Sequence, residues 1–222
     1  MVFFLLLTII NDINCVNKNI ISNFVQNTIK INQKTFFIMK NFPVKVNGKE
    51  YWISRSVAAV GFVFKKVNNT IYALVEQRGV GAADNIHSYC VACGYIDFDE
   101  NGRRCIAREM LEECGFKCNI NKLSLVSVTT DPRGNKQNIS LHYVYKADVN
   151  ENYDLNSRRG GEENEIEKVE WIPVASVNGD KITFKDDYIK DKTWAFNHDK
   201  LIKYYIEHYE TLQEIPENIV YD

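Results

Sequence analysis

The most constraining feature of this chain is the segment Gly94–Phe116, in which glycines, acids and apolar residues stand at fixed spacing. Within it, apolar residues of the stretch Arg104–Cys114 recur every three or four positions, which predicts one amphipathic helix. Glu109, Glu112 and Glu113 fall together on another face of that helix. The apolar face, which we expect to be buried, contains Ile106, Ala107, Met110, Leu111 and Cys114.

Acids gathered on one helix face need a positive partner. Carboxylates three or four positions apart repel each other by about 0.2–0.5 kcal/mol per pair in an isolated helix. Arg108 can offset part of this repulsion through its i,i+4 partner Glu112, but one guanidinium cannot neutralise three acids. Clustered carboxylate oxygens without a nearby histidine favour Mg²⁺ or Mn²⁺ over zinc. The alternative is a solvated acidic face that binds nothing.

Glycines and turn-forming residues delimit the predicted helix. Gly94 and Gly102 bracket a loop rich in acids and turn formers, and this loop leads to the start of the helix. Gly115 follows the acidic pair directly, where a glycine commonly ends a helix. This order of loop, short acidic helix and loop favours a metal site over a solvated face.

The whole segment resembles, at every position, the Nudix box G-x5-E-x7-R-E-U-x-E-E-x-G-U, in which U is a bulky apolar residue. The resemblance extends over about residues 39–210. Ala73–Gly79 looks like the family's strand before the substrate loop, and Glu165–Pro173 resembles a late strand that often follows an extra acid. Where many members carry Pro-Gly-Gly, this chain has Cys93-Gly94-Tyr95. That departure leaves the loop geometry and the substrate fit open.

The resemblance implies an α/β fold of the α+β kind, with a mixed β-sheet between helices in an α/β/α sandwich. It also implies a metal-dependent pyrophosphohydrolase that cleaves the diphosphate linkage of a nucleoside diphosphate joined to another group. A nucleotide sugar, ADP-ribose, a dinucleotide or a nucleoside triphosphate would fit this description. The cofactor would be Mg²⁺ or Mn²⁺.

The resemblance also suggests roles for individual residues. It makes Glu109, Glu112 and Glu113 metal ligands, together with the backbone carbonyl of Gly94. It makes Arg108 the residue that orients these glutamates through ion pairs.

Two further residues support the site in this interpretation. Glu100 would tie the loop to the helix, and Gly115 would end the helix behind the acids. The simpler alternatives are an exposed helix pair for Arg108 and an ordinary turn acid for Glu100.

The general base has more than one candidate. Some relatives use the glutamate next to the box arginine, here Glu109, whereas others use an acid from a later loop. In that loop the candidates are Glu162, Glu163 and Glu165, of which we name Glu165; the alternative for each is an ordinary acidic surface loop. Arg78 could bind a substrate phosphate, although a single loop arginine more often faces solvent. We assign no catalytic role to His87, His142 or His198, which have no evident partners.

Composition excludes several other classes of protein. With 45% hydrophobic residues and a formal net charge of −2, the chain reads as soluble and globular and has no basic tract for nucleic acid or a membrane surface. We expect a nucleotide-type small molecule as the partner, no nucleic acid and no stable membrane association. We leave open a homodimer.

The expected domains are an N-terminal extension of residues 1–38, a Nudix domain of residues 39–215 and a C-terminal tail of residues 216–222. The extension is rich in Asn, Ile and Lys and contains no Gly, Ala, Pro, Glu or Arg. Three interpretations remain open for it: a segment outside the domain upstream of a start at Met39, a secretion signal, or an anchor. Its apolar run Val2–Ile10 is too short to span a bilayer.

The six cysteines permit a zinc site but do not require one. Cys90-x2-Cys93 and Cys114-x3-Cys118 have a spacing used by zinc sites. Buried free thiols explain them more simply, because Cys114 lies on the apolar face of the predicted helix. We therefore expect reduced cysteines and a cytoplasmic location.

Alternating and apolar runs predict strands on both sides of the acidic helix. We expect a final amphipathic helix over Trp194–Leu212, and the strand at Ile166–Ile172 should end at Pro173. The buried side of the final helix should contain Phe196, Leu201, Ile202, Tyr205 and Ile206. The other predicted strands are Ser56–Phe64, Thr70–Glu76, Ser88–Cys93, Leu123–Thr130 and Ile139–Asp148, with a turn at Lys65–Asn69.

Two other functions compete with hydrolysis. The first is a catalytically silent Nudix-fold module that senses or binds nucleotides, and the intact glutamate set argues against it. The second is a zinc-stabilised interaction domain, which rests on the cysteines alone. Tightly held stoichiometric zinc in the purified protein would favour the second.

Deleting residues 1–38 should leave a folded protein with unchanged activity, because this segment differs in composition from the remainder of the chain. Solubility and circular dichroism of the truncated protein measure this directly. Loss of solubility would show that the segment belongs to the core.

Overall fold

The structure is a computed structural model that describes residues 41–133, 137–158, 161 and 163–217. It divides into two units, residues 1–54 and residues 55–222, and each is considered by itself. In the first unit, the described residues form a hairpin of β1 (Phe42–Val46) and β2 (Lys49–Ile53). Its turn is Asn47-Gly48, with φ of 50° and 78°, as a tight hairpin turn requires. This hairpin was not predicted from the sequence.

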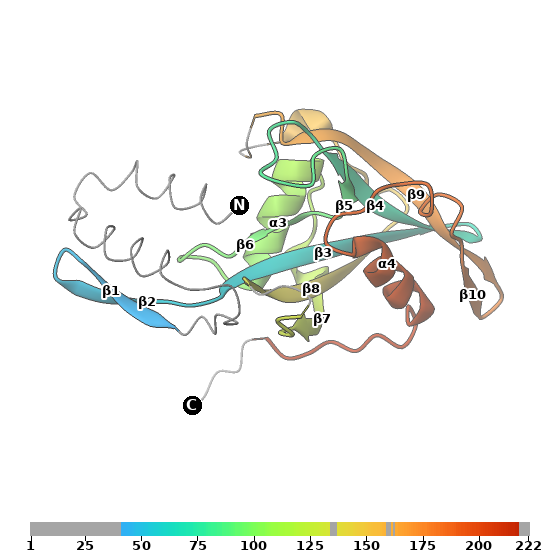
Figure 1. Cartoon of the computed structure of the whole chain (residues 1–222). Helices are drawn as coiled ribbons and strands as arrows, with labels where there is room; N and C mark the ends of the chain where they lie inside the picture. The colour runs from blue at the N-terminus through green and yellow to red at the C-terminus, as the bar shows by residue number, and fades with distance from the viewer. Residues whose placement is uncertain (1–40, 134–136, 159–160, 162, 218–222) are drawn as a thin grey trace, which may run out of the picture. The chain divides into compact units, whose positions relative to one another are not determined.

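The second unit is built on a mixed β-sheet (Figure 1). Along the sheet the strand order is β10-β9-β4-β3-β8-β7, with β5 paired to β4 and β6 paired to β3. The β3–β8 pair is parallel and the other pairs are antiparallel. The strands are β3 (Ser56–Val67), β4 (Thr70–Arg78), β5 (Tyr89–Cys90), β6 (Cys93–Tyr95), β7 (Ser124–Thr129), β8 (Asn138–Ala147), β9 (Ile166–Asn178) and β10 (Lys181–Phe184).

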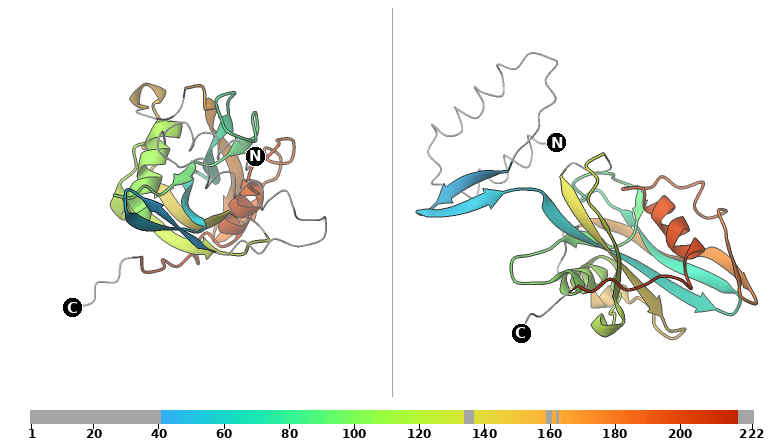
Figure 2. Two further views of the ribbon diagram at one scale, coloured as in Figure 1. Left: turned by 60° about the vertical axis from the view of Figure 1, so that its left-hand side comes forward. Right: turned by 90° about the horizontal axis from the view of Figure 1, so that it is seen from below.

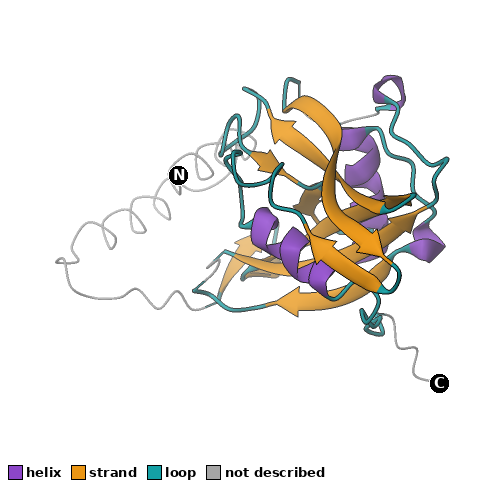
Figure 3. Ribbon diagram, turned by 90° about the vertical axis from the view of Figure 1, so that its right-hand side faces the viewer, coloured by secondary structure: helices purple, strands orange, loops and turns teal. Residues whose placement is uncertain are grey.

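Two α-helices cover opposite faces of this sheet, α3 (Gly102–Cys114) and α4 (His198–Glu207). Short 3₁₀ helices, η1 (Ile120–Lys122) and η2 (Leu155–Ser157), lie in the connections. Figures 2 and 3 show the sheet between the two α-helices from further directions. The layering therefore confirms the predicted α+β class with a mixed sheet.

The central strand β3 shows how the two faces arise. Its side chains alternate between the two cores, as the period of two along a strand requires. Phe62 and Phe64 belong to the core that also contains Ile202 of α4. Val63 belongs to the other core, together with Met110 of α3. Because β3 is buried on both faces, its sequence is an almost continuous apolar run.

Helix α3 agrees closely with the prediction. It begins at Gly102, two residues before the expected Arg104, because the side chain of Asn101 accepts a hydrogen bond from the Arg104 amide. It ends at Gly115, whose φ of 65° is the left-handed conformation that glycine adopts most easily. Ile106, Met110 and Cys114 are buried as predicted, whereas Ala107 and Leu111 are half-buried.

The prediction that Pro173 ends its strand is wrong. Strand β9 continues to Asn178, and Pro173 pairs with Tyr72 of β4. At this point the register shifts, since Ile71 pairs with Ala175 and the next residue of β4 pairs with Pro173. A bulge is one of the few places in a sheet where proline is tolerated, because it has no amide hydrogen to donate.

The last helix is shorter than predicted. Of the expected Trp194–Leu212, only His198–Glu207 is α-helical. Phe196 and Asn197 both have left-handed φ, 58° and 57°, so the helix cannot include them. Phe196 is 42% exposed and was wrongly predicted to be buried.

The other residues of the predicted buried side behave as expected. Ile202, Tyr205 and Ile206 are buried, and Leu201 packs against the same core. Strand β10 was not foreseen. No helix among the described residues is both long enough and apolar enough to cross a membrane.

Two buried histidines hold α4 against the sheet. His198 Nδ1 accepts a hydrogen bond from the Val91 amide over 3.2 Å, which requires a neutral ring. His142 Nδ1 lies 2.7 Å from the Tyr205 hydroxyl. Burial lowers the pKa of His198 to about 3 and that of His142 to about 4.

These histidines should make the protein acid-sensitive. The folded state keeps them neutral while the unfolded state takes up protons below about pH 6.5, so their stabilising contribution is complete above that pH and decreases as the pH falls towards 4. We expect a loss of roughly 1 kcal/mol per pH unit for each histidine, measured by urea unfolding between pH 7 and 4.5. His198→Asn should reduce this slope, whereas His208→Asn, an exposed control, should not. Equal slopes in both variants would contradict the assignment.

Candidate active site

Arg108 is the centre of the charged cluster on α3. Its guanidinium forms a two-pronged ion pair with Glu100, with Nη2 and Nε at 2.6 and 3.1 Å from the two carboxylate oxygens. Nη1 donates to Glu109 at 2.7 Å and to Glu112 at 3.0 Å. The Glu100 pair is the main reason why the pKa of Arg108 is raised. One cation therefore joins the loop before the helix to two of the three clustered acids.

Glu100 also fixes the loop. Its carboxylate accepts a hydrogen bond from the Asp97 amide over 3.1 Å, and the hydrogen bond from Arg108 lowers its pKa. The predicted contacts of Arg108 with Glu112 and of Glu100 with the helix are thus present. The roles of these residues in catalysis remain predictions.

Glu109 lies directly against the backbone of Gly94. A Cβ atom added at Gly94 would be 1.8 Å from Glu109 Oε1, so only glycine permits this approach. Burial raises the pKa of Glu109 to about 7, despite the adjacent Arg108. The structure therefore brings together Gly94 and Glu109, two of the predicted ligand residues.

Glu113 points inward from the same helix and is only 3% exposed. Its Oε2 accepts a hydrogen bond from the Cys93 amide over 2.9 Å, next to Gly94. Burial and the neighbouring Glu76 raise the pKa of Glu113 well above its usual range. Glu112 stays nearer the surface and contacts Arg108. Glu109 and Glu113 therefore face β6, whereas Glu112 lies nearer the surface.

Glu76 of β4 also lies at the cluster, although its sequence position did not predict this. Its carboxylate is fully buried and accepts hydrogen bonds from the thiols of Cys90 and Cys114, both over 3.2 Å. Burial raises the pKa of Glu76 to about 7. The available signal was an acid directly after the apolar run Ile71–Val75 in the same strand, since acids are rarely buried without partners.

Arg158 was missed as well. Its Nε donates to the backbone carbonyl of Glu112 over 2.8 Å, near the end of α3. A cation there is favoured by the helix dipole. No sequence signal identified this contact, which joins residues 46 positions apart.

Of the later acids that the structure describes, Glu165 acts electrostatically on the cluster. It is half-buried, and its charge contributes to the raised pKa of Glu109 and of Glu113, for which burial is the main cause. Glu163 is exposed, and Glu162 lies outside the described residues.

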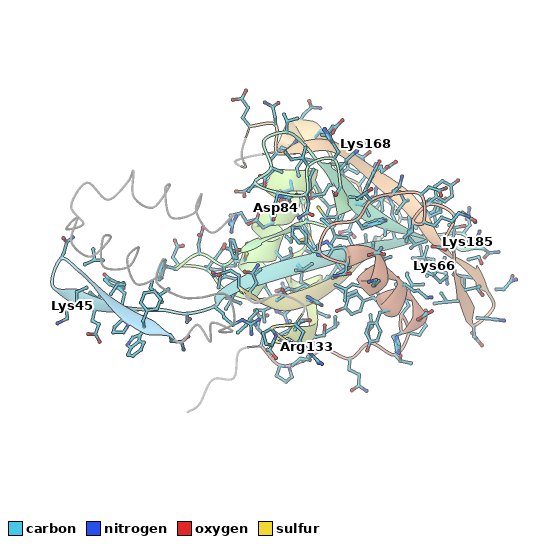
Figure 4. The ribbon with its side chains drawn as sticks, in the orientation of Figure 1. Lys45, Lys66, Asp84, Arg133, Lys168 and Lys185 are labelled. Carbon is cyan, nitrogen blue, oxygen red and sulfur yellow. The ribbon has the colours of Figure 1, made fainter. Side chains whose placement is uncertain are left out.

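Arg78 does not face solvent, so that alternative is wrong. Its side chain is buried, with Nε donating to the Asp84 carbonyl over 3.0 Å and Nη2 reaching the Asp84 carboxylate at 3.5 Å. Asp84 is labelled in Figure 4, on the loop that follows β4. The Phe196 ring lies 5.5 Å from the guanidinium carbon. Substrate binding by Arg78 remains a prediction.

The donor atoms at the cluster suit a hard cation. The candidate donor atoms are the oxygens of three glutamates and the Gly94 carbonyl, and Glu109 lies directly against Gly94. The described residues contain no group of three or more His, Cys, Asp or Glu side chains arranged so that they could hold a metal ion. Glu109 and Glu112 instead face Arg108, which supplies the positive charge in this structure.

The cysteines are free thiols wherever the structure describes them. Cys90 and Cys114 both donate to Glu76, whereas Cys118 lies near Glu151. The four cysteines with zinc-like spacing therefore do not converge on one point.

Residues 55–193 match the family model of the NUDIX domain, which is more than half of the chain. The match begins where the second unit of the structure begins. No curated protein matches this chain. The predicted domain limits of 39–215 are not tested by this match and remain a prediction.

Solved structures show the same fold at low identity. The NUDIX domain of Shewanella oneidensis NrtR, solved with ADP ribose, has a TM-score of 0.53 and 14% identity, covering 71% of this chain and 90% of that chain. A MutT/nudix family protein from Enterococcus faecalis has a TM-score of 0.54 and 13% identity, covering 85% and 69%.

A third structure comes from Francisella tularensis, a bifunctional NMN adenylyltransferase/ADP ribose pyrophosphatase solved with AMP and an Mn ion. It has a TM-score of 0.51 and 18% identity, covering 70% of this chain and 42% of that chain. At these identities the likeness demonstrates a shared fold.

The family match agrees with both the complete Nudix box of the sequence and the sheet and helices of the structure. It confirms the predicted Nudix resemblance and the predicted enzyme class, a Nudix-type pyrophosphohydrolase. The chain belongs to the NUDIX domain family.

Proposed function

We propose that this protein is a divalent-metal-dependent hydrolase that cleaves the diphosphate linkage of a nucleoside diphosphate joined to another group. The observation that carries the proposal is the approach of Glu109 to Gly94, with Arg108 bridging Glu100, Glu109 and Glu112. This arrangement gathers acids where repulsion would otherwise separate them.

Glu109, Glu112 and Glu113, with the Gly94 carbonyl, would hold Mg²⁺ or Mn²⁺. When bound, such an ion neutralises phosphate charge and lowers the pKa of an attacking water. Arg108 orients Glu109 and Glu112, and its two-pronged pair with Glu100 fixes its own position. Gly115 contributes by ending α3 directly behind the acids.

We assign the general base to Glu165. The assignment is supported by its half-buried side chain and by its charge, which affects both Glu109 and Glu113; as general base it would accept a proton from water. Glu109 is the second candidate, but its carboxylate already accepts a hydrogen bond from Arg108.

The substrate is proposed to be a nucleotide-type small molecule. Two proteins of the same fold were solved with ADP ribose and with AMP, which supports ADP-ribose and related diphosphates as the first compounds to test. The Mn ion in one of these structures supports a divalent cofactor. Free thiols at the five described cysteines support a reducing, cytoplasmic location.

A hydrolysis screen tests the function directly. Purified protein is incubated with nucleotide sugars, ADP-ribose, dinucleotides or nucleoside triphosphates, each with Mg²⁺, with Mn²⁺ or with chelator, and the products are separated. Metal-dependent cleavage of at least one class supports the proposal. Binding of these compounds without any cleavage would support the nucleotide-sensing module instead.

Glu112→Gln and Glu113→Gln should each reduce kcat by about 100-fold or more, because each removes a charged oxygen ligand while preserving side-chain shape. Glu207→Gln, the same change on an exposed face of α4, serves as the matched control. Circular dichroism should show intact folding in all three variants. Near-normal rates in both box variants would refute the metal assignment.

Arg108→Lys should weaken activity by roughly 10- to 100-fold, because lysine cannot reproduce the planar fork that holds Glu100 while reaching Glu109 and Glu112. Activity is measured as a function of Mg²⁺ concentration, and the Mg²⁺ concentration that gives half-maximal activity should differ from that of the wild type. An unchanged metal curve would show that Arg108 does not organise the ligands.

A further inference from the structure

The glycine-rich loop after β4 lies directly against the segment that carries Glu165. The Gly79 amide donates to the Glu165 carbonyl over 2.6 Å, and the Gly81 amide donates to the Asn164 carbonyl over 2.9 Å. The two segments can be followed side by side above β4 and β9 (Figure 1). The loop thus extends the β4–β9 pairing beyond the end of the strands.

Neither glycine leaves room for a side chain. A Cβ atom at Gly79 would be 2.2 Å from the Asn164 carbonyl oxygen, and one at Gly81 would be 2.1 Å from the Glu163 carbonyl oxygen. Both obstacles are backbone atoms, which cannot turn aside as a flexible side chain can. Neither residue has a left-handed φ. Close approach is therefore the reason for glycine at both positions.

A bulge in β9 lies next to this contact. Gln77 pairs with Lys168, but the following residue, Arg78, pairs with Ile166, so Glu167 is an extra residue in β9. Bulges bend a strand and redirect the side chains beside them. The bulge and the two glycines together set the path of the chain through Glu165.

We propose that Gly79 and Gly81 are positioning residues of the active site, which hold the backbone of Asn164–Glu165 so that the Glu165 carboxylate stays beside the box glutamates. The inference rests on the proposed function, in which Glu165 is the general base. It explains why two glycines separated by one residue follow β4.

A double-mutant cycle separates positioning from general damage. Gly81→Ala should lower kcat by about 10- to 100-fold with little change in KM, since a displaced base slows the chemical step and not binding. In the Glu165→Gln background, Gly81→Ala should cause almost no additional loss. Val80→Ala, a change at the exposed residue between the glycines, should behave like the wild type.

Amide exchange provides a readout that needs no substrate. In the wild type and in Val80→Ala, the Gly79 and Gly81 amides should exchange slowly, because both are hydrogen-bonded to the Glu165 segment. Gly81→Ala should accelerate exchange of the Gly79 amide. If Gly81→Ala does not fold, Gly79→Ala serves as the second variant.

Each outcome is decisive. If the kcat loss in the double variant equals the product of the losses from Gly81→Ala and Glu165→Gln alone, the inference is wrong. Fast exchange of both amides in the wild type would also overturn it. Either result would leave the proposed hydrolase function intact. Normal activity of Glu165→Gln would remove both the base assignment and the inference that rests on it. A wild type that cleaves no compound in the screen would refute the proposed function itself.

Discussion

Repulsion between acids is the constraint on which this structure depends. Glu109, Glu112 and Glu113 occupy less than two turns of one helix, and Glu76 lies beneath them in the sheet. Burial favours the neutral form of a carboxyl group, and neighbouring negative charges favour it further. The protein offsets this repulsion with the positive charge of Arg108 and with hydrogen bonds from backbone amides and thiols. The acids can therefore remain close together.

The sheet provides the rigid support for this cluster. Strand β3 is buried on both faces and pairs with β6, so the Gly94 backbone is anchored to the centre of the fold. Met110 and Ile106 fix the opposite side of α3 in the core. The carboxylates thus project from a helix and face a strand, both of which are held by apolar packing. Sites on such elements are more precise than sites on loops.

Several features could be predicted from local sequence because their causes are local. The acidic face of α3 follows from helical periodicity, and its end at Gly115 follows from the special backbone freedom of glycine. Other predictions failed where distant residues decide. Pro173 does not end its strand, because a bulge opposite Tyr72 accommodates it. Another failure had a local cause: Phe196 and Asn197 both have left-handed φ before α4 begins, and Phe196 is exposed.

The sequence by itself determined the chemistry: an intact set of acids, one arginine and the glycines at a spacing that matches the family. Only the tertiary structure decided which further groups join them. Glu76 lies 33 positions before Glu109 in the chain, and Glu165 follows the end of the box at Phe116 by 49 positions. Strand pairing across the sheet brings both to the same site. Spacing along a helix is readable locally because its geometry repeats, whereas register between strands depends on the packing of the whole sheet.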